Sequence, residues 1–127
     1  MPSRQDVLET VLDSTYSDWD AVGDSYIYTD DVQISIQLEE LRSPIFTNAV
    51  PEGDSPVREL EVSILFNNQP IYQEIAYESV DNEFIAVADD TMSLTDDQAK
   101  FSSVLRMIVY GKPLSVNYLQ KKGYSIE

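Results

Sequence analysis

Residues 13–31, DSTYSDWDAVGDSYIYTDD, hold the densest run of chemically active side chains in the sequence. Carboxylates at this density have three uses in proteins: they ligate calcium, they imitate the phosphates of nucleic acid, or they keep a surface hydrated. The acidic and aromatic residues of this stretch are Asp13, Asp18, Asp20, Asp24, Asp30 and Asp31, and Tyr16, Trp19, Tyr26 and Tyr28. The elements that carry these residues decide which use applies.

Calcium ligation has the least support of the three. From Asp18 onward, DWDAVGDSYIYT places aspartate at loop positions 1, 3 and 7 and glycine at position 6. An EF-hand loop also needs an oxygen ligand at position 5 and a glutamate at position 12, where this chain has Val22 and Thr29. Two missing ligands forfeit most of the charge that holds the ion, so we expect no metal site.

Catalytic motifs are absent from the sequence. The chain has no cysteine and no histidine, which excludes thiol nucleophiles, Ser/His/Asp triads and the usual ligands of transition metals. Its four glycines, at positions 23, 53, 111 and 123, form no phosphate-binding loop. Pairs of carboxylates alone are too common here to indicate glycoside hydrolysis. We expect no catalytic residue, no cofactor and no enzymatic activity.

The charge of −15 is unevenly distributed along the 127 residues. Residues 1–99 contain 22 acidic and three basic side chains, whereas residues 100–127 contain one acidic and five basic side chains. Such a surface repels nucleic acid and anionic membranes and attracts basic proteins. No apolar run is long enough for a membrane span, and the N-terminus lacks the apolar core of a secretory signal. We expect a cytoplasmic protein, or a virion protein if the source is viral.

Two helices are well signalled and a third is short. Ser3 and Asp6 form a capping box before an apolar stripe, and together they predict a helix over residues 4–16. The stripe continues through Tyr16 toward Trp19. A second capping box, Thr95 with Gln98, predicts a helix that ends at Gly111 and Pro113. A short helix follows and stops at Gly123.

Strict alternation of apolar and polar residues predicts strands at 32–38 and 57–66. The segments SYIYT, IYQEIAYES and FIAVAD are shorter strands, and the turns NNQP and VDNE join the later ones into a meander. Residues 43–56, with three prolines and one glycine, predict a long loop. The expected inward residues are Val32, Ile34, Ile36, Leu38, Leu60, Val62, Ile64 and Phe66.

These elements predict an α+β fold: an antiparallel sheet of four to five strands with an N-terminal helix and one or two C-terminal helices packed on one face. We expect one domain over residues 1–127, with a basic C-terminal segment at 111–127. Phe101, Leu105 and Ile108 should pack against the inward residues of strand 57–66.

The leading hypothesis is a non-catalytic interaction or assembly subunit of a salt-adapted organism or its virus, because an acid surplus with few lysines suits near-molar salt. The expected acidic face consists of Glu59, Glu61, Asp89, Asp90, Asp96 and Asp97, and binds a basic protein. The expected basic end consists of Lys112, Lys121 and Lys122. Opposite charges at two ends suit a head-to-tail homo-oligomer. The alternative is an inhibitor that imitates nucleic acid and occupies the basic groove of a DNA- or RNA-binding protein, rather than a protein that binds nucleic acid or membrane itself.

Overall fold

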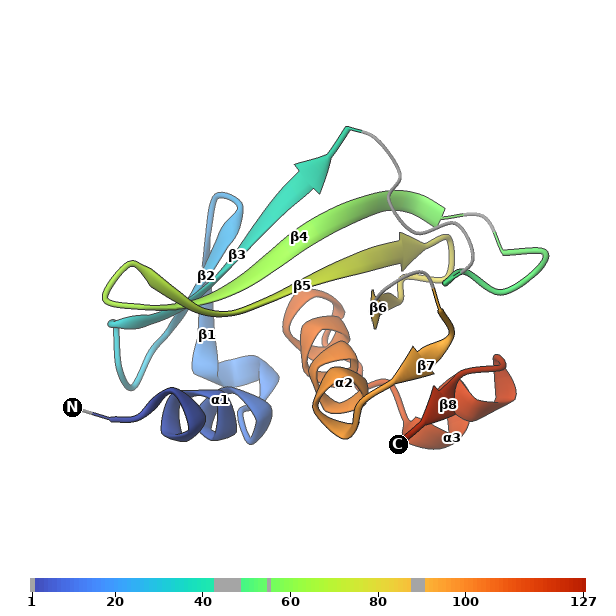
Figure 1. Cartoon of the computed structure of the whole chain (residues 1–127). Coiled ribbons are helices and arrows are strands. Elements are labelled where there is room, and N and C mark those ends of the chain that lie inside the picture. The colour runs from blue at the N-terminus through green and yellow to red at the C-terminus, as the bar shows by residue number, and fades with distance from the viewer. Residues whose placement is uncertain (1, 43–48, 55, 88–90) are drawn as a thin grey trace.

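The computed structural model describes residues 2–42, 49–54, 56–87 and 91–127. Within these residues an antiparallel sheet has the strand order β1-β2-β3-β4-β5-β6, and β7 pairs in parallel with β8. The elements are α1 (Arg4–Leu12), a 3-10 turn η1 (Tyr16–Asp18), β1 (Trp19–Val22), β2 (Ser25–Tyr28), β3 (Ile34–Leu41), β4 (Pro56–Phe66), β5 (Gln69–Ser79), β6 (Phe84–Val87), β7 (Ser93–Leu94), α2 (Asp96–Tyr110), α3 (Val116–Lys121) and β8 (Ser125–Ile126). Figure 1 shows the helices on one side of the sheet. The predicted α+β class is confirmed.

The predicted number of strands is too low, because the described sheet has six. Sequence reasoning missed β1, whose four residues include Asp20 and lie in an aspartate-rich stretch that resembles a loop. β1 and β2 form a hairpin with a two-residue turn at Gly23 and Asp24. Gly23 has a φ of +62°, which a type II′ turn requires at its first central position. The short β7–β8 pair was also missed.

The first helix is shorter than predicted. α1 begins after the Ser3–Asp6 capping box, as expected, but it ends at Leu12. Thr15 is extended, so Tyr16 lies outside the helix and is 58% exposed. Trp19 is buried as the first residue of β1 instead, where its ring packs edge-on against Tyr28 at a centroid distance of 5.2 Å.

Two boundaries of the sheet also differ from the predicted ones. β3 begins at Ile34, so Val32 precedes the strand and is 76% exposed. β4 begins at Pro56, so the predicted loop ends one residue earlier than expected. Residues 43–48 and 55 of that loop lie outside the described residues.

The inner face of the sheet packs against α1 and α2. Phe101, Leu105 and Ile108 of α2 share one buried cluster with the inward residues of β4, which confirms the predicted packing. The cluster also holds three residues of α1, namely Val7, Leu8 and Val11. Capping explains the bounds of α2: Thr95 and Gln98 form the predicted capping box, and Gly111 ends the helix with a φ of +76°.

A second buried cluster surrounds the edge strand β6. All four residues of β6 are buried, with Phe84 in the first cluster and Ile85 and Val87 in the second. Leu119 and Tyr124 from the C-terminal segment complete the second cluster. The last residues of the chain therefore pack with the side chains of β6.

Candidate functional site

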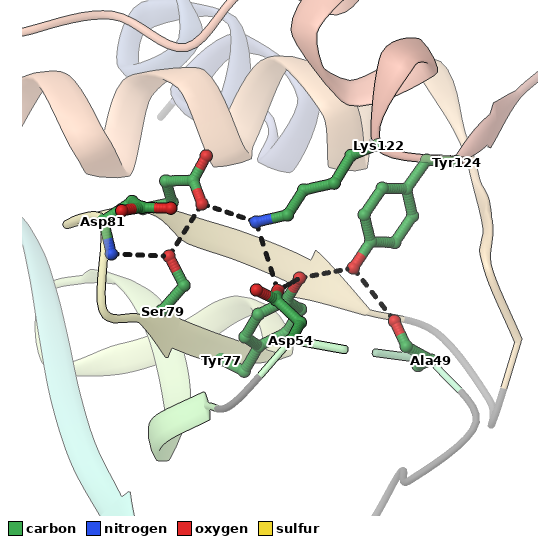
Figure 2. A network of polar contacts seen from close by, with 8 residues as sticks. Ala49, Asp54, Tyr77, Ser79, Asp81, Lys122 and Tyr124 are labelled. Carbon is green, nitrogen blue, oxygen red and sulfur yellow. Dashed lines mark hydrogen bonds and ion pairs between the residues drawn. The ribbon is translucent and has the colours of Figure 1, made fainter. Parts of the chain in front are cut away.

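A network of ion pairs and hydrogen bonds joins the C-terminal segment to the β5–β6 turn and to residues 49–54 (Figure 2). Lys122 Nζ lies 2.6 Å from Glu83 Oε1 and 3.1 Å from Asp54 Oδ2. The Lys122 side chain is only 14% exposed and that of Glu83 only 2%. The Ser79 hydroxyl donates to the same Glu83 oxygen at 2.7 Å. Each buried charge in this network therefore has a partner.

Two tyrosines extend the network into the second buried cluster. The Tyr77 hydroxyl donates to Asp54 Oδ2 at 3.1 Å. The Tyr124 hydroxyl lies 2.9 Å from the carbonyl oxygen of Ala49 and 2.8 Å from the Tyr77 hydroxyl oxygen. Because a hydroxyl has a single proton, Tyr124 donates to one of these two acceptors at a time.

The protonation states of the network follow from burial and from these contacts. Burial alone lowers the pKa of Lys122, but the hydrogen bonds and charges of Glu83 and Asp54 outweigh it and raise that pKa above its ordinary value. Burial alone raises the pKa of Glu83, but hydrogen bonds from Lys122, Tyr118 and Ser79 lower it overall. Burial raises the pKa of Tyr77, and the contacts with Tyr124 and Asp54 raise it further. At neutral pH the lysine is therefore a cation, the glutamate an anion and the tyrosine neutral. These paired charges hold the C-terminal segment against the β5–β6 turn and residues 49–54.

The network corrects the predicted basic end. Lys112 and Lys121 are exposed, as that hypothesis requires, but Lys122 is held inside the molecule. Lys112 lies two residues after the end of α2, whereas Lys121 ends α3. Sequence alone could not separate Lys122 from its neighbour, because both partners of Lys122 are far away along the chain.

The residues of the predicted acidic face do not form one surface. Leu60 and Val62 face the helices, so the alternation of β4 places Glu59 and Glu61 on the opposite face of the sheet. Glu59 is buried, with 7% of its surface exposed, and Glu61 is half-buried. The expectation of an exposed Glu59 is therefore wrong.

The remaining predicted acids lie elsewhere. Asp96 is exposed and Asp97 half-buried in the first turn of α2, which packs against the inner face. Asp96 pairs with Lys100 at 3.1 Å. Asp89 and Asp90 lie outside the described residues.

A concave site that sequence reasoning missed lies at the tip of the β1–β2 hairpin. There β3 continues past β2, and Leu38 N–H donates to the carbonyl oxygen of Asp24 at 3.1 Å. A hollow of about 440 Å³ opens beside this point. Its polar lining includes Asp24, Glu39, Glu40, Arg58 and Tyr26, and its apolar lining includes Leu38, Leu60 and Val109.

The charge of this hollow is acidic. Arg58 Nε lies 2.7 Å from Glu78 Oε1, so its charge is already compensated by a carboxylate on the next strand. Burial raises the pKa of Tyr26, which keeps its hydroxyl neutral. The carboxylates of Asp24 and Glu40, with that of Glu39 beside them on the opposite face of β3, therefore dominate the electrostatic potential, and a cationic group is the natural ligand.

A second hollow of about 250 Å³ shares Tyr26 and Val109 with the first. Tyr16, Trp19 and Ala21 line it from the hairpin side. Both hollows take part of their lining from the interleaved stretch at residues 13–31. Core packing is confirmed for Trp19, whereas Tyr16 and Tyr26 line the hollows.

The open face of the sheet carries a like-charge pair. Glu39 and Glu61 lie directly opposite each other on β3 and β4. Such a pair is unfavourable for stability. Gln73 Nε2, on β5, lies 3.4 Å from Glu61 Oε1 and partly compensates.

Within residues 2–42, 49–54, 56–87 and 91–127, no three acidic side chains are grouped so that they could hold a metal ion. None of the helices in the described part of the chain is both long enough and apolar enough to cross a membrane. No protein-family model matches the sequence, and no curated protein or solved structure is significantly similar to it.

Proposed function

We propose that the protein is a non-catalytic interaction or assembly subunit whose acidic surface, centred on the β1–β2 hairpin, binds a basic protein. The observation that carries this proposal is the local imbalance of charge. Between Arg4 and Arg42 the sequence has ten acidic residues and no basic one. The structure folds this stretch into α1, the hairpin and β3, and the hairpin and β3 border the larger hollow.

The basic side chains of the chain are largely engaged in internal contacts. Arg58 pairs with Glu78 and Lys122 with Glu83, as described above. Arg4 Nε donates to the carbonyl oxygen of Ile71, and Arg106 Nη1 donates to that of Lys112 at 2.8 Å. Because these basic groups already have partners, the carboxylates of the hairpin are available to bind an external cation. Long-range attraction then steers a basic partner to this surface.

Imitation of nucleic acid has less support. A mimic needs carboxylates in one continuous row on one surface. Glu61 and Asp97 lie on opposite sides of the sheet, so the predicted acids do not make such a row. A high-salt environment remains a compatible setting for the binding of a basic protein, because screening relieves the repulsion among the acids.

Charge reversal tests the proposal. Asp24 and Glu39 line the larger hollow and are exposed, so Asp24→Lys with Glu39→Lys should abolish capture of the partner from the native lysate. The matched control is Glu9→Lys with Asp81→Lys, which changes the net charge equally at exposed sites outside the hollow. We expect the control to retain the partner. Equal loss in both variants would show that net charge alone drives the association and would contradict the proposal.

Head-to-tail self-association is tested separately. Lys112 and Lys121 are exposed, and their reversal to glutamate should lower the sedimentation coefficient if they contact the acidic surface of a second copy. An unchanged coefficient would restrict the proposal to a different protein as partner.

A further inference from the structure

We infer that the free edge of β1 binds an extended, basic segment of the partner as an added antiparallel strand. This inference rests on the proposed function and names the part of the partner that is recognised. β1 is the terminal strand of the described sheet and pairs only with β2. An edge of this kind is a template for a further strand.

The hairpin geometry identifies the backbone groups that are available. Val22 and Ser25 flank the two-residue turn, and Asp18 O accepts a hydrogen bond from Thr29 N at 2.8 Å. Hydrogen-bonded pairs alternate in an antiparallel ladder, so Asp18, Asp20 and Val22 direct their N–H and C=O groups toward β2. The groups of Ala21 point the other way, toward the open edge, and Ala21 is exposed.

The smaller hollow provides room for the side chains of an added strand. Ala21 lies on the same face as Trp19 and Tyr26, and all three line the hollow of about 250 Å³. An added strand would run about 4.8 Å from β1. Its inward side chains would lie beside the small side chain of Ala21, over Tyr16, which is 58% exposed. Apolar residues therefore suit these inward positions.

The charge at this edge selects the kind of segment. Asp20 projects to the outer face, is exposed, and is the only charged residue among the described residues that line the hollow. A second copy of β1 would bring its own Asp20 to the same place, which repulsion disfavours. A lysine or arginine at each outward position would instead attract it. The favoured segment thus alternates basic outward residues with apolar inward ones.

Two N-methylated peptides test the inference without altering the protein. The probe is acetyl-Lys-Val-Lys-Val-Lys-Val-amide at physiological salt. In an antiparallel added strand the residue opposite Ala21 shares its face and its hydrogen-bonding direction, so the valine N–H groups point toward β1. Methylation of the backbone nitrogens of the valines should weaken binding about tenfold or more, because their hydrogen bonds to β1 are lost. Methylation of the backbone nitrogens of the lysines gives a peptide with the same charge and composition as the first, and it should leave binding unchanged.

Amide hydrogen exchange gives a second readout. On binding of the unmethylated peptide, exchange of the Ala21 amide should slow, whereas the amides of Asp20 and Val22, already bonded to β2, should change little. In Ala21→Pro the outward N–H is removed, and proline is tolerated at an edge position of this kind, so binding should fall.

The outcomes separate the two proposals. Equal affinity of both methylated peptides would overturn strand addition and leave general binding at the acidic surface intact. Failure of the unmethylated peptide to bind would also overturn strand addition. The proposed function fails separately, if Asp24→Lys with Glu39→Lys retains the partner.

Discussion

At the scale of single residues, a lysine held between two carboxylates stabilises the fold only while all three groups keep their charges. Lys122, Asp54 and Glu83 come from three distant parts of the chain, and each is mostly withdrawn from water. Removal of one member leaves the others buried without compensation, which costs far more than the loss of an exposed ion pair.

Lys122→Met should therefore lower the free energy of unfolding by about 3 kcal/mol. Lys121→Met, the same change one residue earlier at an exposed site, should alter it by no more than about 0.5 kcal/mol. Urea denaturation of the two variants measures both values. Similar effects at the two positions would show that Lys122 is not internal.

Acid should weaken this network through Glu83. Its pKa is lowered in the folded state, so Glu83 contributes stability above the unfolded value of 4.5, and this contribution is lost as the pH falls through the folded value. Glu83→Gln should remove this contribution and flatten the fall of stability below pH 4.5. Lys122 behaves oppositely: its raised pKa contributes stability below 10.5, which is lost as the pH rises through the folded value. Denaturation curves over a pH series test both limbs, and an unaltered acid limb in Glu83→Gln would contradict the assignment.

The role of a residue could be predicted from the sequence where its partners lie nearby along the chain. Ser3 with Asp6 and Thr95 with Gln98 cap their helices as expected, because each box involves positions three residues apart. The burial of Glu59 could not be predicted in this way. It depends on the residues that β3 and β5 bring opposite it, which are Leu41 and Tyr77.

At the scale of elements, the strength of the pattern decided what could be predicted. The sequence of β4 alternates from Glu59 to Ile64, so its predicted inward residues were correct. β1 has only four residues and three of them are exposed, so it has no alternation to detect. The candidate site lies beside this missed strand, which is why no sequence pattern located it.

The packing of α2 on the sheet predicts a contrast between two leucines. Leu105 of α2 is 1% exposed in the first buried cluster, so Leu105→Ala should lower the free energy of unfolding by about 2–5 kcal/mol through the cavity that it leaves. Leu65 of β4 is half-buried on the opposite face, so Leu65→Ala should cost distinctly less. Thermal denaturation of the two variants measures the difference. A smaller effect at Leu105 would show that the phase of the helix is wrong.

At the scale of the whole molecule, the net charge of −15 opposes folding through self-repulsion, and salt relieves it. We expect the melting temperature to rise with KCl concentration. A fold that is lost below about 0.5 M KCl would support adaptation to high salt, because screening is then required for stability.

The like-charge pair on the open face connects stability with binding. Glu39→Lys places a cation opposite Glu61, so it should raise the free energy of unfolding by about 0.2–1 kcal/mol, most strongly at low salt. The same change should weaken capture of the basic partner. Denaturation at two salt concentrations and the capture assay test the two effects together. Destabilisation by Glu39→Lys would show that the pair is not repulsive.

The parallel β7–β8 pair determines how the molecule responds to a mechanical load. β8 contributes two residues to this pair and α3 has six residues, whereas β4 has 11 residues, paired on both sides. In Figure 1 the N-terminus lies beside α1 and the C-terminus lies beyond α2, next to α3 and β8, so tension between the two ends pulls on the C-terminal segment directly. That segment should detach at low force and extend before the sheet yields. A force applied at the C-terminal end would thus first extend the C-terminal segment, while the sheet stays folded.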